Sequence, residues 1–249
     1  MYHFYTDRSN IGEDEIVLTG EDVNHIKNVL RMRVGEELII CDGEGMDHFC
    51  RIEAYENGSV KAHIIESGNA KAELSARLYL FQGLPKKDKM ELIIQKAVEL
   101  GVYEIVPVMT KRVIVKLDDE KKELKKLERW QAIAEAAAKQ SGRGMIPRVH
   151  RPVSFKEAME MSAEIKVNLI PYENADNSSD GMEQSRLLIR SLKGQESVSV
   201  FIGPEGGFEP AEVEEALSAG YKCISLGRRI LRTETAGLTA LSVIMFELD

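Results

Sequence analysis

The chain has 249 residues, 43% hydrophobic and 30% charged, a composition typical of a soluble globular protein with one large domain or two smaller ones. A formal net charge of −8 excludes a protein that coats nucleic acid nonspecifically. It has no apolar run long enough for a membrane helix, and its first residues lack the order of a signal peptide, so we expect a cytoplasmic protein without membrane association. Neither the three cysteines nor the five histidines show metal-binding spacing, so no metal and no disulfide framework is expected.

The first 70 or so residues have the pattern of short strands separated by turns. Apolar-rich runs predict strands at 16–18, 37–41, 48–55 and 60–65. Asn57-Gly58 predicts a tight hairpin between the last two, and apolar residues at helical spacing predict a helix over 22–31. Closely spaced short strands favour a small β-barrel. A polar stretch at 66–70 marks the expected boundary between domains 1–70 and 71–249.

Beyond that boundary, predicted strands and helices alternate. The expected strands are 77–82, 103–109, 166–170, 197–202 and 223–226. The expected helices are 87–100, 120–139, 155–161, 182–192, 210–218 and 235–247. This alternation is typical of an α/β domain with a mostly parallel sheet and helices on both faces.

The segment 202–208 is rich in glycine and follows a predicted strand. Gly203, Gly206 and Gly207 allow its backbone to approach a ligand closely, and the segment opens onto a helix N-terminus. Open α/β sheets bind ligands at this edge. The pattern is neither a Walker A loop nor a dinucleotide-binding fingerprint, and a glycine-rich connector without a ligand has the same composition.

A second loop, 226–236, contains three arginines and two threonines before an apolar helix. One interpretation is a helix start capped by Thr233 or Thr235, with exposed arginines. The other is a loop whose backbone, Ile230 and Leu231 hold an adenosine while Arg232 faces an RNA substrate. The planar guanidinium of arginine suits that contact, because it pairs with phosphate and base oxygens and stacks on rings.

Together, Gly203-Pro204-Glu205-Gly206-Gly207 and the loop 226–236 resemble the paired signature of the SPOUT methyltransferases. More narrowly, they resemble the bacterial family that methylates N3 of a uridine in 16S ribosomal RNA. Three further blocks resemble that family, namely His25-x-x-x-Val29-Leu30-Arg31 with Asp42-Gly43, Lys89 to Gly101 with Pro107, and Ala136-x-x-x-Gln140-Ser141-x-Arg143-x-x-x-Pro147. Each block alone is weak, but five in the right order across the chain are specific.

The resemblance implies an N-terminal PUA-like β-barrel that binds RNA and a C-terminal SPOUT α/β domain with a deep trefoil knot. It also implies S-adenosylmethionine as cofactor, a homodimer, and 16S ribosomal RNA or the small ribosomal subunit as partner. The cofactor would lie between the two loops and the end of an earlier strand. The implied cofactor-binding residues are Leu169, Ile170, Pro171, Ile202, Gly203, Pro204, Gly206, Gly207, Leu226, Gly227, Ile230, Leu231, Thr235 and Ala236.

Basic residues gather in clusters on this acidic chain. A focused basic patch binds RNA selectively, although a single cluster is more often a solvated face. The expected RNA-binding residues are His3, Arg8, His25, Arg31, Arg33, Lys86, Lys89, Arg112 and Arg143. His3 stands where the resembled family usually has arginine, which leaves the N-terminal contact open between His3 and Arg8.

Methylation at N3 of uracil requires loss of the N3 proton, which spreads negative charge over O2 and O4. We expect Arg232 to stabilise that anion, and Glu205, Glu234 or water to accept the proton. Two other functions compete with this one. A non-catalytic RNA-binding ribosome-assembly factor would not need the intact loops. An unrelated nucleotide-dependent α/β enzyme, such as a dehydrogenase, would need a Rossmann fingerprint that is missing.

Overall fold

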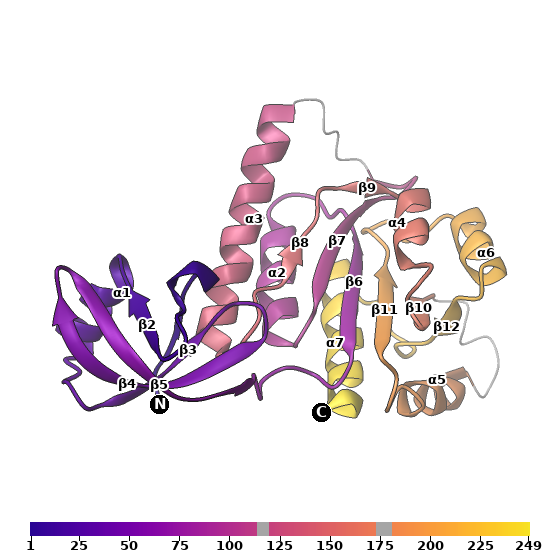
Figure 1. The fold of residues 1–249 in the computed structure, drawn as a ribbon. Coiled ribbons are helices and arrows are strands. Elements are labelled where there is room, and N and C mark those ends of the chain that lie inside the picture. Colours follow the sequence, from indigo (N-terminus) through magenta and orange to yellow (C-terminus); the bar gives the residue numbers. More distant parts are fainter. Residues whose placement is uncertain (114–119, 173–180) are drawn as a thin grey trace. The chain divides into compact units, whose positions relative to one another are not determined.

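The computed structural model describes residues 1–113, 120–172 and 181–249 (Figure 1). These residues form two compact units, one of Met1–Glu73 with Ala138–Ile146 and one of Leu74–Ala137 with Pro147–Asp249. The segment Ala138–Ile146 thus belongs to the first unit, whereas a division at residue 70 leaves it with the second. Among the described helices, none has the length and apolar character needed to cross a membrane.

The first unit contains a five-stranded mixed sheet with the order β1-β3-β4-β5-β2. Its strands are β1 (His3–Tyr5), β2 (Glu15–Leu18), β3 (Glu37–Cys41), β4 (Met46–Glu56) and β5 (Ser59–Asn69). Strand β1 pairs parallel with β3, and the other neighbours are antiparallel. Four of these strands match the predicted runs, but β1 was not predicted. The single helix predicted over 22–31 is instead a short α1 (Glu21–Asn24) that continues as a π-helix (His25–Val29).

The predicted hairpin between β4 and β5 is confirmed. Asn57 has φ 49° and Gly58 has φ 78°, and two successive positive φ values are what a two-residue hairpin turn requires. On the sheet, alternate residues of each strand face the same interior. The buried side chains include Ile16, Leu18, Leu38, Ile40, Cys50, Ile52, Val60 and Ala62.

The second unit is an α/β domain whose paired strands all run parallel, as predicted. Its sheet has the order β12-β10-β11-β6-β7-β8, and β9 also pairs with β7. The strands are β6 (Arg77–Gly83), β7 (Glu104–Met109), β8 (Arg148–Val149), β9 (Val153–Ser154), β10 (Val167–Pro171), β11 (Ser197–Ile202) and β12 (Lys222–Ile224). The helices are α2 (Lys89–Glu99), α3 (Glu120–Ser141), α4 (Phe155–Ser162), α5 (Gly181–Arg190), α6 (Pro210–Ser218) and α7 (Thr233–Leu248).

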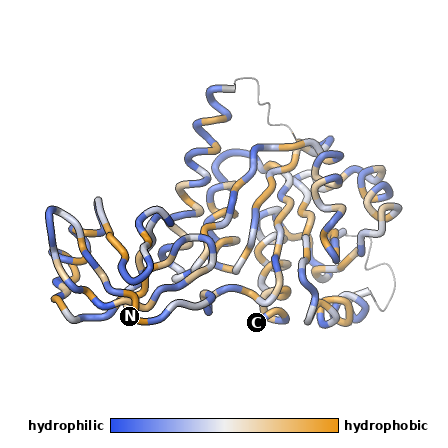
Figure 2. Tube along the Cα trace, in the orientation of Figure 1, coloured by the Kyte–Doolittle hydropathy of each residue, from blue (hydrophilic) through white to orange (hydrophobic). Residues whose placement is uncertain are grey.

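Helices cover both faces of this sheet (Figure 1), because its central strands consist largely of hydrophobic residues (Figure 2) that are buried. Phe201, Phe81 and Val106 are neighbours in register across β11, β6 and β7, so they point to one face. There they join residues of α4 and α6, and the rings of Phe81 and Phe201 stack at 4.3 Å. On the other face, α7 packs against β6, β11 and α2. This two-sided burial fixes the strand ends from which the functional loops begin.

Candidate functional site

A cavity of about 580 Å³ lies where the carboxyl end of β10 meets the loops after β11 and β12. That volume is in the range of about 300–1,000 Å³ typical of small-molecule pockets. Its lining residues are Lys89, Arg112, Pro171, Tyr172, Ile202, Gly203, Pro204, Glu205, Gly206, Gly207, Phe208, Pro210, Ser225, Leu226, Gly227, Arg229, Ile230, Leu231, Arg232, Thr233 and Ala236. The glycine-rich and arginine-rich loops therefore share one cavity, at the strand edge where the sequence predicted a site.

Close backbone packing explains why glycines occur at this edge. A Cβ atom on Gly83, at the end of β6, would lie 2.6 Å from the backbone nitrogen of Pro204. A Cβ atom on Gly203 would lie 3.1 Å from the backbone of Gly207, which itself has φ 69°. The loop after β11 can fold back against β6 only because neither Gly83 nor Gly203 carries a side chain.

The hydroxyl of Thr233 connects the two loops. It donates to the carbonyl oxygen of Gly203 at 2.6 Å and accepts a hydrogen bond from Nε2 of Gln82 at 2.9 Å. Thr233 therefore does not cap α7, which begins after Arg232 without any side-chain cap. Gln82 is fully buried near the carboxyl end of β6, a central strand of the sheet. The start of α7 is thus tied both to the glycine-rich loop and to strand β6.

Two carboxylates and one lysine form an ion-paired group at the cavity. Nζ of Lys89 lies 3.3 Å from Oε1 of Glu205 and 3.1 Å from Oε2 of Glu234. The backbone N–H of Lys86 also donates to Glu205 at 3.0 Å. Burial raises the pKa of each carboxyl group, but backbone N–H donors and the Lys89 ammonium outweigh burial and hold both pKa values below the ordinary value. Both carboxylates are therefore ionised at neutral pH.

Arg112 holds the glycine-rich loop from the side. Its Nε donates to Oε1 of Glu209 at 2.7 Å, and its Nη1 donates to the carbonyl oxygen of Gly206 at 2.7 Å. Next to it, the backbone N–H of Lys111 donates to Glu212 at 2.9 Å. Arg112 was predicted to contact RNA, and in the structure its guanidinium braces the loop that lines the cavity.

Several predicted cofactor residues reach the cavity and others do not. Arg232 is exposed at the cavity wall, and its charge contributes to lowering the pKa of Glu234. Ile230 is 85% exposed at the same wall. Leu169, Ile170 and Thr235 do not line the cavity, and the first two are fully buried in the sheet. The prediction did not include Tyr172, Phe208, Pro210, Ser225, Arg229 and Thr233, which do line it.

The predicted RNA-binding residues fall on both units. Lys86 is exposed beside the cavity loops, and Arg8, His25, Arg31 and Arg33 are exposed on the first unit. Arg8 pairs there with Glu44 at 2.8 Å.

Arg143 differs from these residues because it is only 2% exposed. Its Nε donates to Glu73 at 3.2 Å, and Nη2 makes a second bond to the same carboxylate. The backbone N–H groups of Gly144 and Met145 donate to Glu73 as well. This arginine therefore fastens the segment Ala138–Ile146 within the first unit and offers no surface to RNA.

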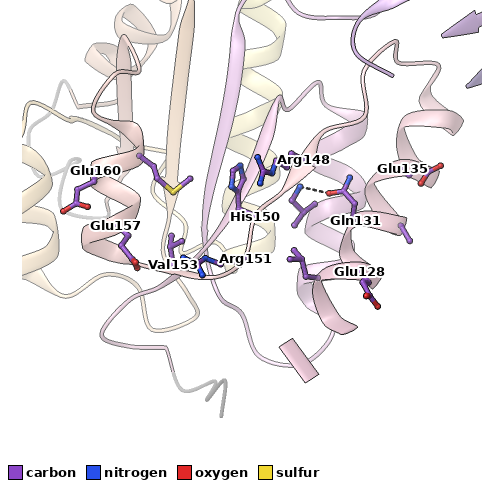
Figure 3. A pocket seen from close by; sticks show the side chains of 13 residues that line it. Glu128, Gln131, Glu135, Arg148, His150, Arg151, Val153, Glu157 and Glu160 are labelled. Carbon is purple, nitrogen blue, oxygen red and sulfur yellow. Dashed lines mark hydrogen bonds between the residues drawn. The ribbon is translucent and has the colours of Figure 1, made fainter. Parts of the chain in front are cut away.

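A second cavity, of about 870 Å³, lies on the second unit between α3 and α4, beside β8 and β9 (Figure 3). Its labelled side chains are mixed in charge, with Arg148 and Arg151 among several glutamates. The Gln131 side chain donates to the carbonyl oxygen of Pro147 and accepts from the N–H of Val149 at 2.9 Å. Gln131 thereby occupies the edge of the sheet, as a further strand would. The sequence predicted no site residue here.

A parallel sheet with a loop-lined cavity at its carboxyl edge is the architecture of ligand-binding α/β enzymes. A family profile described as RNA methyltransferase domain matches residues 72–245, and one described as RNA methyltransferase PUA domain matches residues 18–65. The class is therefore that of RNA methyltransferases with a PUA domain.

Relatives define the family within that class. The ribosomal RNA small subunit methyltransferase E of Bacillus subtilis is 39% identical, over 93% of this chain and 90% of the relative. That of Mesomycoplasma hyopneumoniae is 35% identical, over 97% and 98%. The crystal structure of the Neisseria gonorrhoeae enzyme bound to S-adenosyl methionine has a TM-score of 0.78 and 32% identity, covering 99% of this chain and 97% of that one. The chain belongs to the ribosomal RNA small subunit methyltransferase E family, and the family resemblance noted in the sequence is confirmed.

Proposed function

We propose that this protein transfers a methyl group from S-adenosylmethionine to N3 of a uridine in 16S ribosomal RNA. The observation that carries the proposal is the shared cavity of the two loops, which are separated in the chain by α6 and β12. Family membership supports catalysis over a non-catalytic assembly factor, because the Neisseria gonorrhoeae relative is described as bound to S-adenosyl methionine.

The residues of the cavity fit this cofactor. Backbone groups of the glycine-rich loop can bond the polar edge of an adenine, and Leu226, Ile230 and Leu231 offer apolar surface to its ring. The ionised carboxylates of Glu205 and Glu234 suit a ligand that carries a positive sulfonium. When bound, S-adenosylmethionine supplies the activated methyl group. Leu169 and Ile170, which are buried in β10, would not contact the cofactor directly but would position Pro171.

We assign stabilisation of the uracil anion to the exposed guanidinium of Arg232. A guanidinium carries only N–H donors, and it can donate to O2 or O4, where the negative charge develops. Glu205 and Glu234 have lowered pKa values and are paired with Lys89, which makes them weak proton acceptors. Of the three acceptors left open by the sequence, these features favour water. The two carboxylates would then hold Lys89 and tune the charge of the cavity.

The remaining assignments are part of the same proposal. Domain 1–70 would be a PUA-like barrel that binds RNA through exposed Arg8, His25, Arg31 and Arg33, and the PUA match over residues 18–65 supports it. Domain 71–249 would contain the deep trefoil knot and mediate a homodimer. The protein would act in the cytoplasm on 16S ribosomal RNA or the assembled small subunit.

The test compares 16S ribosomal RNA from cells with and without this protein by mass mapping, and we expect one N3-methyluridine to disappear. In vitro, Arg232→Ala should retain S-adenosylmethionine affinity by calorimetry and lose methylation by about 100-fold or more. Wild-type turnover by Arg232→Ala would exclude the assigned role. A wild-type protein that does not bind S-adenosylmethionine would favour the assembly factor.

A further inference from the structure

Three side chains with metal-binding chemistry meet on one face of the first sheet. Tyr5 of β1 lies opposite Cys41 of β3, and Cys41 lies opposite Asp47 of β4. Side chains directly opposite each other project from the same face of a sheet, as do residues two apart on one strand. His3, two residues before Tyr5, therefore shares this face with Cys41 and Asp47.

The donor atoms of these side chains lie close together. Nε2 of His3 is 3.2 Å from Sγ of Cys41 and 3.4 Å from Oδ1 of Asp47. All three ligand atoms are within 4.8 Å of one another. Cys41 is fully buried, and the side chains of His3 and Asp47 are only 16% and 22% exposed. The group is thus compact and shielded from bulk solvent.

One buried oxygen of the Asp47 carboxylate also lacks a hydrogen-bond donor. This Oδ1 is buried and, apart from the 3.4 Å contact with Nε2 of His3, has no hydrogen-bond partner among the described residues, although buried carboxylate oxygens are normally satisfied. The segment Ala138–Ile146 packs over it, since a Cβ atom on Gly144 would lie 3.3 Å from this oxygen. The nearby guanidinium of Arg143 is neutralised by Glu73 and does not repel a cation.

We propose that His3, Cys41 and Asp47 bind one Zn²⁺ ion. Imidazole, thiolate and carboxylate are the ligands that Zn²⁺ takes in proteins, and bonds of about 2.0–2.3 Å in a tetrahedron separate neighbouring donors by about 3.3–3.8 Å. The two donor distances given above are close to that range. Tyr5 bonds through its hydroxyl to the carbonyl oxygen of Arg143, so water completes the coordination.

Such an ion would stabilise the first unit by joining β1, β3 and β4. Zinc binds cysteine as the thiolate, so binding at Cys41 releases the thiol proton to solvent as the sulfur–zinc bond forms. The ligands come from three strands and form no spacing motif, which is why the sequence predicted no metal site.

The test uses the tag-free full-length chain, stripped with a chelator and kept reduced. Titration with ZnCl₂ should give one ion per chain, and a hundredfold excess over Kd should raise Tm by about 5–10 °C. With Co²⁺, the wild-type protein should show a near-ultraviolet thiolate-to-metal absorption band. Cys41→Ser, Asp47→Asn and His3→Asn should each lose zinc binding and the Tm shift.

Matched controls separate this site from other thiols and imidazoles. Cys223→Ser and His63→Asn, which alter residues outside the group, should bind zinc and cobalt as the wild type does. Circular dichroism checks that each variant folds. The cobalt band of the wild type does not depend on any variant, so a folded wild-type chain that takes up no zinc and shows no such band overturns the proposal. Zinc uptake unchanged in folded Cys41→Ser would overturn it as well.

Discussion

Replacement of Thr233 by valine removes the hydroxyl that joins the two cavity loops while keeping the shape of the side chain. Thr233 is 4% exposed, so water cannot easily replace the lost group. The carbonyl oxygen of Gly203 would lose its donor, and Nε2 of Gln82 would keep only its bond to the carbonyl oxygen of Gly83, at 3.1 Å. Thr233→Ser, which retains the hydroxyl, is the matched control.

The expected magnitude follows from these two contacts. A buried polar group left without its partner costs about 1–3 kcal/mol. For a chain of this size, that corresponds to a fall in Tm of about 2–12 °C. Because the bond also sets the distance between the loops, we expect the Kd for S-adenosylmethionine to rise about tenfold, which corresponds to about 1.4 kcal/mol.

Two measurements check this prediction. Calorimetric unfolding gives Tm for the wild type, Thr233→Val and Thr233→Ser, and titration calorimetry gives the cofactor Kd for the same three proteins. We expect Thr233→Ser to lie close to the wild type in both. If Thr233→Val matches the wild type in Tm and Kd, the hydroxyl does not join the loops in the way described.

Three further predictions concern the same edge of the sheet. Gly83→Ala should lower the free energy of unfolding by about 1–3 kcal/mol in urea, because its Cβ atom meets the Pro204 backbone, whereas Gly68→Ala, with open space around it, should not. Arg112→Gln should weaken cofactor affinity in calorimetry by freeing the Gly206 carbonyl, while leaving the salt dependence of RNA binding unchanged. The lowered pKa values of Glu205 and Glu234 imply stability that is complete above their ordinary pKa of 4.5 and lost as pH falls through the folded values. Urea unfolding between pH 3 and 7 should show a smaller loss of stability in Lys89→Met than in the wild type, because the folded pKa values of the two carboxyl groups then lie closer to the unfolded ones. Identical profiles would contradict the pairing.

The local patterns of the sequence predicted most elements of the fold. The strands Glu37–Cys41 and Ser197–Ile202 and the helix Pro210–Ser218 have the predicted bounds, because apolar periodicity and turn residues act over a few neighbouring positions. Strand β1 was missed because its three residues are too few to show the alternation of apolar and polar residues that marks a strand. It forms only by pairing with β3. The short edge strands β8 and β9 were missed for the same reason.

Some residues of the candidate site could also be predicted from local sequence, and others could not. Glycines and arginines in two loops indicated where a ligand would bind, since their backbone requirements are local. The bracing role of Arg112 and the burial of Arg143 depend on partners far along the chain, namely Glu209 and Glu73. A basic residue in a sequence carries no sign of whether its partner is an RNA phosphate or a carboxylate of its own chain.

These ion pairs limit where the proposed RNA site of this acidic protein can draw its positive charge. Lys89 and Arg112 are both neutralised within the second unit, so neither contributes a free charge to the cavity wall. Among the arginines that line the cavity, Arg229 and Arg232 are exposed and take part in no ion pair within the described residues. Attraction of an RNA phosphate or a uracil anion would therefore concentrate on the loop that also contacts the proposed cofactor. The charge that selects the substrate and the charge that stabilises its anion would then come from the same few residues, which couples RNA binding to the chemistry.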